Sequence, residues 1–507
     1  MEDWLDPLYD ADGMRASDSW AIDTAGVASL DLMEAAGAAL ADAAIASCGP
    51  GPARVVCGKG NTGGDGLVAA RLMAAAGLDV ETLLLWPADE LSPDAATNLE
   101  RLDGHHREVD REIDAALGGS GVVVDAIFGT GFSGAPRAPA DAAIDAINAC
   151  GSPVVAADVA SGVDASTGEV ARAAVKADLT VTFHAAKLGH RIHPGKGRTG
   201  ELRVADIGIP AGAPAAPAGG SIRDAVLDLL PRRGPQSTKF TSGQVVLVGG
   251  SRGLTGAVCL AAEAAIRAGA GYATVAVPAD LEPIFEVKLT EVMSRGFAGA
   301  DGRLAAADAD AIVSACSRAS AVVLGSGLGR DEDSLELARR VAAGVEAPLV
   351  IDADGLNAHA DAPQALAGRG APTVLTPHAG ELSRLLGVDS DAIGAARLAR
   401  AREAAELTDS LVVLKGDDTL VVDHDSLAVA GLSSPALATA GTGDTLAGTI
   451  AALIARGLEP FAAAACAVHA CTRAGRIATA RLGGADSVVA GDVIAALPRA
   501  LVAGPLE

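Results

Sequence analysis

The chain has 507 residues, half of them hydrophobic, and a formal net charge of -25. This length is too great for one hydrophobic core and predicts two or three domains of ordinary size. The acidic charge balance repels nucleic acid and anionic membrane surfaces, so we expect neither as a partner. The seven cysteines show no Cys-x-x-Cys spacing, and no apolar run reaches the length of a membrane span. We therefore expect a cytoplasmic protein in a reducing compartment.

The first half of the chain is expected to form a doubly wound, Rossmann-like α/β/α sheet. Residues 18–47 carry apolar residues at helical spacing and predict a helix that covers this sheet. A strand at residues 54–57 runs into a glycine-rich turn at 58–66, followed by a helix (67–76) and a strand (80–85). This order is typical of a nucleotide-binding fold. No acid ends the second strand where a ribose would be held, so an ordinary dehydrogenase is discounted.

Two further strands of this half end in acidic residues. Asp125 ends one of them and is followed by a glycine-rich loop at residues 128–135, while the next strand leads to Asp158 and Ser161. Lys187 follows another strand. The carboxyl ends of parallel strands line one crevice, so we expect these side chains to face a common polar ligand.

His184, His190 and His193 lie in the loop that follows that strand. Their spacing matches no common zinc pattern, and we expect histidines of a surface loop instead of a metal site.

A Pro/Ala/Gly run at residues 209–220 marks the domain boundary, so we expect domains at 1–210 and 221–507 with a linker at 211–220. The second half reads as another α/β series. Residues 411–423 predict two strands around a tight turn with Lys415 at its lip. Buried strands are expected at residues 244–248, 273–277, 321–325, 348–351 and 373–375.

Residues 440–444 read Ala-Gly-Thr-Gly-Asp and precede an apolar run that we expect to be a helix beginning at Thr445. The two glycines let backbone amides face an anion, and the helix dipole favours negative charge there. A base such as Asp444 beside bound phosphates can take a proton from a hydroxyl that then attacks phosphorus. The stretch predicts a phosphate cradle with a base, and Mg²⁺ held mainly by phosphate oxygens.

Six motifs of the second half occur together in this order: Gly-Gly-Ser-x-x-x-x-Gly-Ala (249–257), Gly-Ser-Gly-Leu-Gly (325–329), Asp-Ala-Asp-Gly-Leu-Asn (352–357), Thr-Pro-His-Ala-Gly-Glu (376–381), Leu-Lys-Gly-x-x-Thr (414–419) and Ala-Thr-Ala-Gly-Thr-Gly-Asp (438–444). Through them, residues 221–507 resemble the ADP-dependent NAD(P)H-hydrate dehydratases, which have a ribokinase-like α/β/α fold.

The first half carries its own motifs: Gly-x-Gly-Asn-x-Gly-Gly-Asp-Gly (58–66), Asp-Ala-Ile-Phe-Gly-Thr-Gly-Phe-Ser-Gly (125–134), Asp-x-x-Ser-Gly-Val-Asp (158–164) and Phe-x-x-x-Lys (183–187). These make residues 11–210 similar to NAD(P)H-hydrate epimerase domains. The two halves together follow the order of the fused bifunctional repair enzymes, and the acid-rich, lysine-poor composition looks salt-adapted. The resemblance implies that the first domain interconverts the R and S forms of hydrated NADH or NADPH. The second would remove water from the S form with ADP or ATP.

In the dehydratase half, the resemblance implies substrate-binding roles for Ala257, Gly327, His378 and Asp444. Asp444 would be the catalytic base that activates the ring hydroxyl toward a phosphate. The residues implied for the adenine nucleotide are Lys415, Gly416, Asp417, Asp418, Thr419, Gly441, Thr442 and Gly443.

In the epimerase half, the resemblance implies Asp158 as the acid–base residue, with Lys187 as a second catalytic candidate that orients it. A potassium ion would be held by Thr62, Asp125 and Ser161, although the family usually has Asn at the first of these positions. The family pattern is also broken at Leu254, where an aromatic residue is usual. The residues implied for the substrate are Asn61, Thr62, Gly63, Gly64, Asp65, Gly129, Thr130, Gly131, Phe132, Ser133, Gly134, Ala135 and Asp158.

Two alternatives share these features. One is a small-molecule kinase of the ribokinase-like fold, which would use the same phosphate cradle. The other is that residues 1–210 form a binding module without catalysis. A sugar or vitamin kinase, however, has no use for a second site of nicotinamide size. We expect small-molecule substrates and a homo-oligomer in either case.

Overall fold

The computed structural model describes residues 2–102, 106–109 and 112–505, which form two compact units. One unit comprises residues 7–219, and the other joins residues 2–6 to the chain from Gly220 onward. We had expected the start of the chain to belong to the first unit, but residues 2–6 group with the second. The reason is that β1 (Leu5–Leu8) is hydrogen-bonded to β9 (Gly219–Ile222) at the edge of the second sheet. Among the described residues, none of the helices combines the length and apolarity that a bilayer crossing needs.

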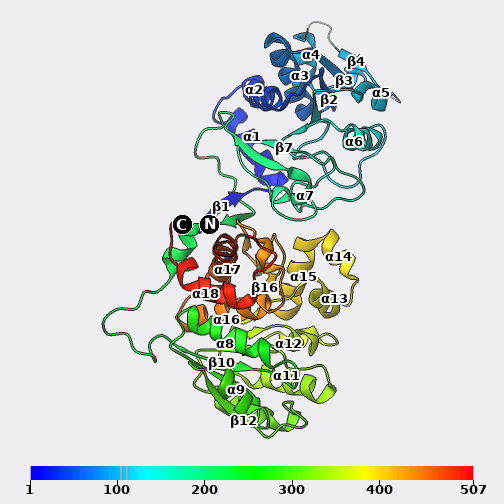
Figure 1. Cartoon of the computed structure of the whole chain (residues 1–507). Helices are drawn as coiled ribbons and strands as arrows, with labels where there is room; N and C mark the ends of the chain where they lie inside the picture. The colour runs from blue at the N-terminus through cyan, green and yellow to red at the C-terminus, as the bar shows by residue number, and fades with distance from the viewer. Residues whose placement is uncertain (1, 103–105, 110–111, 506–507) are drawn as a thin grey trace. The chain divides into compact units, whose positions relative to one another are not determined.

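The N-terminal unit is built on a seven-stranded sheet of order β4-β3-β2-β5-β6-β7-β8, in which all neighbouring strands are parallel (Figure 1). The strand order reverses between β2 and β5. In open α/β sheets, ligands bind at such a switch point, outside the carboxyl ends of the strands. The strands are β2 (Ala53–Cys57), β3 (Val80–Leu84), β4 (His106–Glu108), β5 (Val122–Ala126), β6 (Val154–Ala157), β7 (Leu179–Phe183) and β8 (Glu201–Ala205).

Helices cover both faces of this sheet. Successive residues of a strand point to opposite faces, and apolar residues on each face pack against helices. Val55 and Val124 pack with residues of α2 and α3, whereas Val56 and Val123 pack with residues of α5 and α6. The Rossmann-like α/β/α fold is therefore confirmed. The helices are α1 (Ala11–Asp23), α2 (Ser29–Ser47), α3 (Asn61–Ala75), α4 (Pro93–Glu100), α5 (Ile113–Leu117), α6 (Ala140–Ala149) and α7 (Lys196–Thr199).

Two expected elements of this unit were wrong in their bounds. The single helix expected at residues 18–47 is two helices, α1 and α2, because the chain turns between them where Gly26 has a φ of 75°. The glycine-rich turn is mostly helix, since α3 begins at Asn61. A Cβ on Gly58 would lie 2.0 Å from the Ile127 carbonyl oxygen, and one on Gly63 would lie 1.9 Å from the carbonyl oxygen of Gly58. These glycines therefore permit close packing between β2, α3 and the loop after β5.

The C-terminal unit is built on an eleven-stranded sheet of order β1-β9-β18-β17-β16-β15-β14-β13-β10-β11-β12. Neighbouring strands from β16 to β12 are parallel, while β17 is antiparallel to both β16 and β18. The expected pair of strands around Lys415 is thus confirmed. The remaining strands are β10 (Gln244–Val248), β11 (Tyr272–Pro278), β12 (Met293–Phe297), β13 (Ala321–Leu324), β14 (Leu349–Ile351), β15 (Thr373–Leu375), β16 (Leu411–Leu414), β17 (Leu420–Val422) and β18 (Leu427–Val429).

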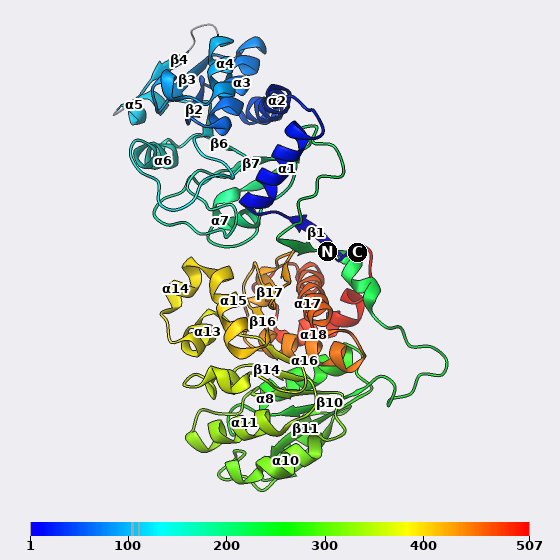
Figure 2. The same ribbon diagram turned by 180° about the vertical axis from the view of Figure 1, so that it is seen from behind.

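One face of this sheet packs against α8, α16, α17 and α18, whose alanines and branched residues share a core with Val245, Leu247 and Val275. Val246 alternates with Val245 and Leu247 along β10 and is in register with Val322 of β13. Both are buried, so the opposite face is also covered. Figure 2 shows α13, α14 and α15 side by side near β16 and β17. The helices are α8 (Thr255–Arg267), α9 (Glu282–Lys288), α10 (Ala309–Cys316), α11 (Glu332–Gly344), α12 (Asp354–Asn357), α13 (Ala379–Leu386), α14 (Ser390–Ala395), α15 (Arg397–Thr408), α16 (Thr442–Ala455), α17 (Pro460–Leu482) and α18 (Ala490–Ala500).

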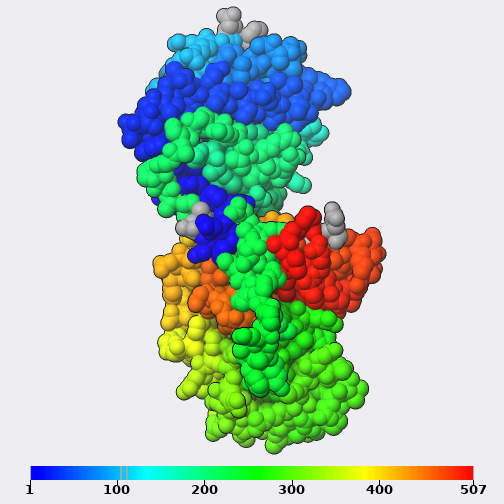
Figure 3. Space-filling model, turned by 90° about the vertical axis from the view of Figure 1, so that its left-hand side faces the viewer, coloured from blue at the N-terminus to red at the C-terminus, as the bar shows by residue number. Residues whose placement is uncertain are grey.

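Two local features of this unit differ from expectation. Helix α16 begins at Thr442, three residues before the expected start, so Gly443 and Asp444 belong to its first turn. The expected linker ends in a strand, because β9 begins at Gly219. A long segment between Leu230 and β10 has no regular structure and forms a loop that stands out from this unit in Figure 1, whereas Figure 3 shows it face-on; its Phe240 side chain is 65% exposed.

Candidate active sites

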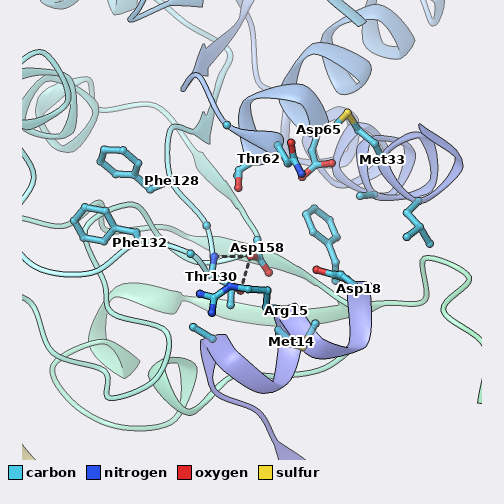
Figure 4. A pocket seen from close by; sticks show the side chains of 18 of the residues that line it. Met14, Arg15, Asp18, Met33, Thr62, Asp65, Phe128, Thr130, Phe132 and Asp158 are labelled. Atoms are coloured by element: carbon cyan, nitrogen blue, oxygen red, sulfur yellow. Dashed lines mark hydrogen bonds between the residues drawn. The ribbon is translucent and has the colours of Figure 1, made fainter. Parts of the chain in front are cut away.

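A cavity of about 670 Å³ opens at the switch point of the N-terminal sheet (Figure 4). It lies where the loops after β2, β5, β6 and β7 meet α1 and α2. The predicted residues Gly63, Gly64, Gly134 and Ala135 are not among its lining residues. Those that line it are Asn61, Thr62, Asp65, Gly129, Thr130, Gly131, Phe132, Ser133, Asp158 and Lys187.

Asp158 and Lys187 form a buried ion pair at this cavity. The Lys187 side chain is 1% exposed, and its Nζ donates to Asp158 Oδ1 at 2.7 Å, to Thr182 Oγ1 at 2.8 Å and to the Phe183 carbonyl oxygen at 2.9 Å. The other carboxylate oxygen, Asp158 Oδ2, accepts from the backbone N–H and the hydroxyl of Thr130 at 2.8 and 2.6 Å. Both groups are therefore held in one fixed position.

Burial alone would raise the pKa of Asp158, but the charge and hydrogen bond of Lys187 and the two hydrogen bonds from Thr130 outweigh it and lower this pKa. Asp158 is accordingly ionised at neutral pH. Asp158 also has a positive φ of 64°, a backbone conformation that non-glycine residues adopt rarely and that clusters at functional sites.

His190 is not a residue of a surface loop, as we had expected, but is buried behind this ion pair. Its Nδ1 accepts from the Lys187 backbone N–H at 3.0 Å, so its Nε2 carries the proton that reaches the Asp158 carbonyl oxygen at 2.9 Å. Burial, together with the Lys187 charge, lowers the pKa of His190 to about 3. A neutral imidazole thus holds the backbone of Asp158 in place through its hydrogen bond to the Asp158 carbonyl oxygen.

Asp125 and Ser161 are not among the residues that line the cavity. Asp125 is fully buried, and its carboxylate accepts from the Ser161 hydroxyl at 2.6 Å, from the Ser161 N–H at 2.8 Å and from the Ile127 N–H at 3.3 Å. Burial raises the pKa of Asp125 to about 6 despite these hydrogen bonds. Thr62 lies beside the loop after β5, because a Cβ on Gly129 would meet its hydroxyl oxygen at 2.4 Å.

The sequence did not single out several lining residues. Asp18 belongs to α1 and reads in the sequence as an acid on a surface helix, and Phe128 and Trp86 read as core residues. Phe128 stacks on Phe132 with ring centroids 4.5 Å apart, and these rings form one wall of the cavity (Figure 4). The one feature of the sequence that could have indicated this wall is the spacing of Phe128 and Phe132, at i and i+4 inside a glycine-rich loop.

In the C-terminal unit, Lys415 joins the ends of two parallel strands. Its Nζ donates to Asp352 Oδ1 at 2.8 Å, and the same oxygen accepts from the Thr376 hydroxyl at 2.8 Å. Glu381 Oε2 lies 3.6 Å from the same Nζ. Burial would lower the pKa of Lys415, but the charges of Asp352 and Glu381 outweigh it and raise this pKa. A cation is thus fixed at the carboxyl edge of the sheet.

Glu381 and His378 cap α13 reciprocally. Glu381 Oε2 accepts from the His378 backbone N–H at 2.9 Å, and His378 Nδ1 accepts from the Gly380 N–H at 3.0 Å. The His378 side chain is half exposed, and burial followed by the charge of Lys415 lowers its pKa, with Glu381 opposing the shift. His378 therefore presents a neutral Nε2–H.

Asp444 lies in the first turn of α16, where backbone N–H groups and the helix dipole favour an anion. Burial, followed by repulsion from Asp352, raises the pKa of Asp444 to about 6. A Cβ on Gly443 would lie 3.3 Å from Lys415 Nζ, so the lysine reaches the backbone beside Asp444. Gly441 precedes the helix with a φ of 92°, which favours glycine.

A second cavity, of about 410 Å³, lies beside this first turn and is lined largely by apolar residues of α17 and of the segment after β18. Asp418 and Gly441, both predicted to contact the nucleotide, are not among its lining residues. The Asp418 carboxylate is buried and pairs with Arg397 at 2.8 Å. The predicted residues that line this cavity are Lys415, Gly416, Asp417, Thr419, Thr442 and Gly443.

The remaining predicted substrate residues lie near one another at the start of α8. Gly327 has a φ of 66°, and a Cβ there would meet the Leu254 carbonyl oxygen at 2.5 Å and the Ala257 Cβ at 3.2 Å. Leu254 is 47% exposed, so the position where the family usually has an aromatic residue faces solvent.

Comparison with known proteins extends over both units. The family model described as NAD(P)H-hydrate dehydratase matches residues 245–499, and the model described as YjeF-related protein N-terminus matches residues 29–189. The bifunctional NAD(P)H-hydrate repair enzyme Nnr of Salinibacter ruber is 38% identical over 97% of this chain and 96% of its own length. The protein of the same name from Escherichia coli is 33% identical over 97% of this chain and 93% of its own length.

A solved structure of the ADP/ATP-dependent NAD(P)H-hydrate dehydratase from Bacillus subtilis is 28% identical, with a TM-score of 0.46, and covers 54% of this chain and 94% of its own. The Salinibacter ruber and Escherichia coli proteins are more than 30% identical to this chain over nearly the full length of both partners in each comparison, which shows that they belong to one family. The chain therefore belongs to the family of bifunctional NAD(P)H-hydrate repair enzymes, with an N-terminal epimerase domain and a C-terminal dehydratase domain.

Proposed function

We propose that the C-terminal unit dehydrates the S form of hydrated NADH or NADPH at the expense of ADP or ATP, and that the N-terminal unit interconverts the R and S forms. The observation that carries this proposal is the position of Asp444. Its carboxylate belongs to the first turn of α16, next to Gly443, which lines a cavity large enough for a nucleotide. The relatives' names, bifunctional NAD(P)H-hydrate repair enzyme, support two activities directed at hydrated NAD(P)H.

In the dehydratase step, Asp444 takes the proton of the ring hydroxyl, and the oxygen attacks the terminal phosphorus of the nucleotide. AMP or ADP leaves phosphorus with the electron pair of the broken phosphorus–oxygen bond. Phosphate then leaves with the electron pair of the carbon–oxygen bond, and the neighbouring ring carbon gives a proton to solvent, so that its C–H electron pair forms the ring double bond again. Lys415 would hold charge that develops on the transferred phosphoryl group, since most of the catalysis in phosphoryl transfer is positioning and electrostatics. We keep ADP and ATP both as donors.

Mg²⁺ would be held mainly by the phosphate oxygens of the nucleotide. Asp352 fits this role on the protein side. Its Oδ1 is engaged by Lys415 and Thr376, whereas Oδ2 accepts no hydrogen bond within the part of the chain that the structure describes. A carboxylate oxygen is the ligand that this ion prefers, and the ion would neutralise the phosphate charge.

In the epimerase unit, we propose that Asp158 accepts a proton from the substrate side through Thr130, which also lines the cavity and whose hydroxyl donates to the carboxylate. Lys187 keeps Asp158 ionised and in place. The stacked Phe128 and Phe132 rings offer an apolar wall on which the planar part of the substrate would lie.

A potassium ion at Thr62, Asp125 and Ser161 fits the chemistry of these residues. All three supply oxygen donors, and Asp125 is buried with no lysine or arginine paired to it among the described residues. A monovalent cation would offset that buried charge. In KCl the unfolding temperature of the N-terminal unit should exceed that in NaCl at equal ionic strength, and Asp125→Asn should abolish the difference.

The remaining proposals concern the surroundings of the protein. All seven cysteines lie in the described part of the chain and are free thiols, five of them buried, which supports a reducing compartment such as the cytoplasm. We retain the homo-oligomer as a proposal that sedimentation would test.

The deciding experiment is a recovery assay on separated R and S hydrates. Incubating the protein with the S hydrate, Mg²⁺ and ADP or ATP should restore the absorbance of reduced nicotinamide. The R hydrate should be consumed at an enzyme-dependent rate only where epimerisation works. Accumulation of a stable phosphoester without recovery of that absorbance would show a small-molecule kinase instead.

A further inference from the structure

The four acceptor positions of the Asp158 carboxylate are already occupied. Oδ1 accepts from Lys187 Nζ and from the Thr182 hydroxyl, at 2.7 and 3.2 Å, and Oδ2 accepts twice from Thr130. Lys187 likewise spends its three N–H groups on Asp158, Thr182 and the Phe183 carbonyl oxygen. Neither member of this ion pair holds a proton ready to be given to a substrate.

Two other carboxyl groups line the same cavity. Asp65 comes from the first turns of α3 and Asp18 from α1, and Figure 4 shows both on the side of Asp158 away from Phe128 and Phe132. Neither carboxyl group has a hydrogen-bond or ion-pair partner in the parts of the chain that the structure describes. Asp65 is 8% exposed, whereas Asp18 is half-buried and more open to the cavity.

Epimerisation requires chemistry on both faces of one ring carbon. Hydration of an enamine places the hydroxyl on the carbon next to nitrogen, so the hydrated ring can lose water with help from the nitrogen lone pair. A proton must be given to the departing hydroxyl on one face and taken from the water that adds to the other face. Two separated groups, one protonated and one ionised, meet this requirement.

We propose that Asp18 is the acid of the epimerase site and works opposite the Asp158–Thr130 pair. The inference rests on the proposed epimerase function. The Asp18 carboxyl gives its proton to the ring hydroxyl of the R form, and the carbon–oxygen bond breaks with its electron pair leaving as water. The ring nitrogen supplies a pair to form a carbon–nitrogen double bond. Water adds to the other face, its proton passes through Thr130 to Asp158, and the S form results. The two carboxyl groups then return to their starting protonation states by exchange with solvent.

The electrostatics of the cavity support this division of roles. Burial raises the pKa of Asp18 to about 6; the charge of Lys187 lowers this pKa and the charge of Asp158 raises it. The charged groups facing the cavity around it are Arg15 on its own helix, Lys59, Asp65, Asp94, Asp158 and Lys187. Burial and the nearby Asp158 and Asp18 carboxylates raise the pKa of Asp65 well above its ordinary value against the opposing charge of Lys187, which disfavours a second negative charge beside Asp18. An acid that titrates close to the working pH is effective in proton transfer.

The test follows the approach of pure R hydrate to the R/S mixture without nucleotide, with the spontaneous rate subtracted at each pH. The full-length protein should show a rate that falls roughly tenfold per pH unit above the pKa of its acid. Asp18→Asn should lower the rate about 100-fold or more and remove this limb of the profile. Asp18→Glu should restore part of the rate, together with the fall of the rate at pH values above the pKa of the glutamic acid.

Asp23→Asn is the matched control, because Asp23 lies at the exposed end of the same helix and does not line the cavity. It should leave rate and profile unchanged. An Asp18→Asn protein that is folded by circular dichroism and keeps the rate within about twofold, limb included, overturns the proposal. If this variant does not fold, the proposal is overturned instead by a wild-type or Asp18→Glu protein whose epimerisation rate does not fall with rising pH. Failure of the wild-type protein to accelerate R/S interconversion at all would contradict the proposed epimerase function and not Asp18 alone.

Discussion

Lys415 Nζ lies 2.8 Å from Asp352 Oδ1, which ties the turn after β16 to the end of β14. The Asp352 side chain is 3% exposed and that of Lys415 is 19% exposed, so little water screens the pair. Both residues also face the first turn of α16, since a Cβ on Gly443 would lie 3.3 Å from Lys415 Nζ and 3.8 Å from Asp352 Oδ2. The pair therefore positions charge where the nucleotide phosphates are proposed to bind.

Removing Lys415 should cost both nucleotide binding and stability. Lys415→Met leaves the Asp352 carboxylate buried without its cation, and breaking a buried ion pair in this way typically costs about 3–5 kcal/mol. Denaturant unfolding should show this loss, and isothermal titration should show loss of ADP and ATP binding. Lys415→Met combined with Asp352→Asn should recover most of the stability but not the binding. Lys288→Met, at an exposed position of α9, is the charge-matched control and should change neither quantity. Equal stability of the wild-type and Lys415→Met proteins would contradict this reading.

The dehydratase rate should follow the ionisation of Asp444. A base acts in its deprotonated form, and burial raises the pKa of this carboxyl to about 6. The nucleotide-dependent rate on the S hydrate should therefore be full above pH 7 and fall as the pH drops through about 6. Asp444→Asn should lower it by about 100-fold or more at all pH values, while R/S interconversion by the same protein serves as the internal control. A rate that keeps rising as the pH falls below 6 would exclude Asp444 as the base.

Asp158→Asn should stop consumption of the R hydrate while turnover of the S hydrate continues. The same residue should also make the N-terminal unit sensitive to acid. Its pKa is lowered in the folded state, so it contributes stability that is present above its ordinary pKa of about 3.9 and is lost as the pH falls below that value. Thermal unfolding between pH 3 and pH 7 should show this loss in the wild-type protein and a smaller one in Asp158→Asn. An identical pH dependence in both proteins would show that the Lys187–Asp158 pair is not formed in solution.

Gly58 and Gly60 should respond differently to the same substitution. A Cβ on Gly58 would lie 2.0 Å from the Ile127 carbonyl oxygen, whereas nothing lies within 4 Å of a Cβ on Gly60. Neither glycine has a positive φ. Gly58→Ala should destabilise the N-terminal unit by about 1–3 kcal/mol through overpacking, and Gly60→Ala by far less. Denaturant unfolding midpoints of the two variants compare the effects directly, and equal midpoints would show that the close approach of the β2 and β5 ends is not rigid.

The sequence by itself determined the architecture and the approximate location of both sites. Runs of valine and leucine such as residues 245–248 and 411–414 predict strands buried on both faces, and each such strand was found. Because parallel strands end at one edge, acids after successive strands had to come together, as Asp125 and Asp158 do around one loop. The glycine-rich motifs carried the family membership, which the relatives confirmed.

Tertiary structure alone decided what these residues can do there. The glycines at 58–66 looked like a turn, but contacts with the distant Ile127 make them part of a packed helix start. His190 looked like a surface residue and is buried, because the loop after β7 folds back over Asp158. Asp18 reads as one more acid on an amphipathic helix until α1 is seen to face the cavity. The pKa of a carboxyl group depends on burial and on charges brought together from distant parts of the chain, and local sequence does not contain that information.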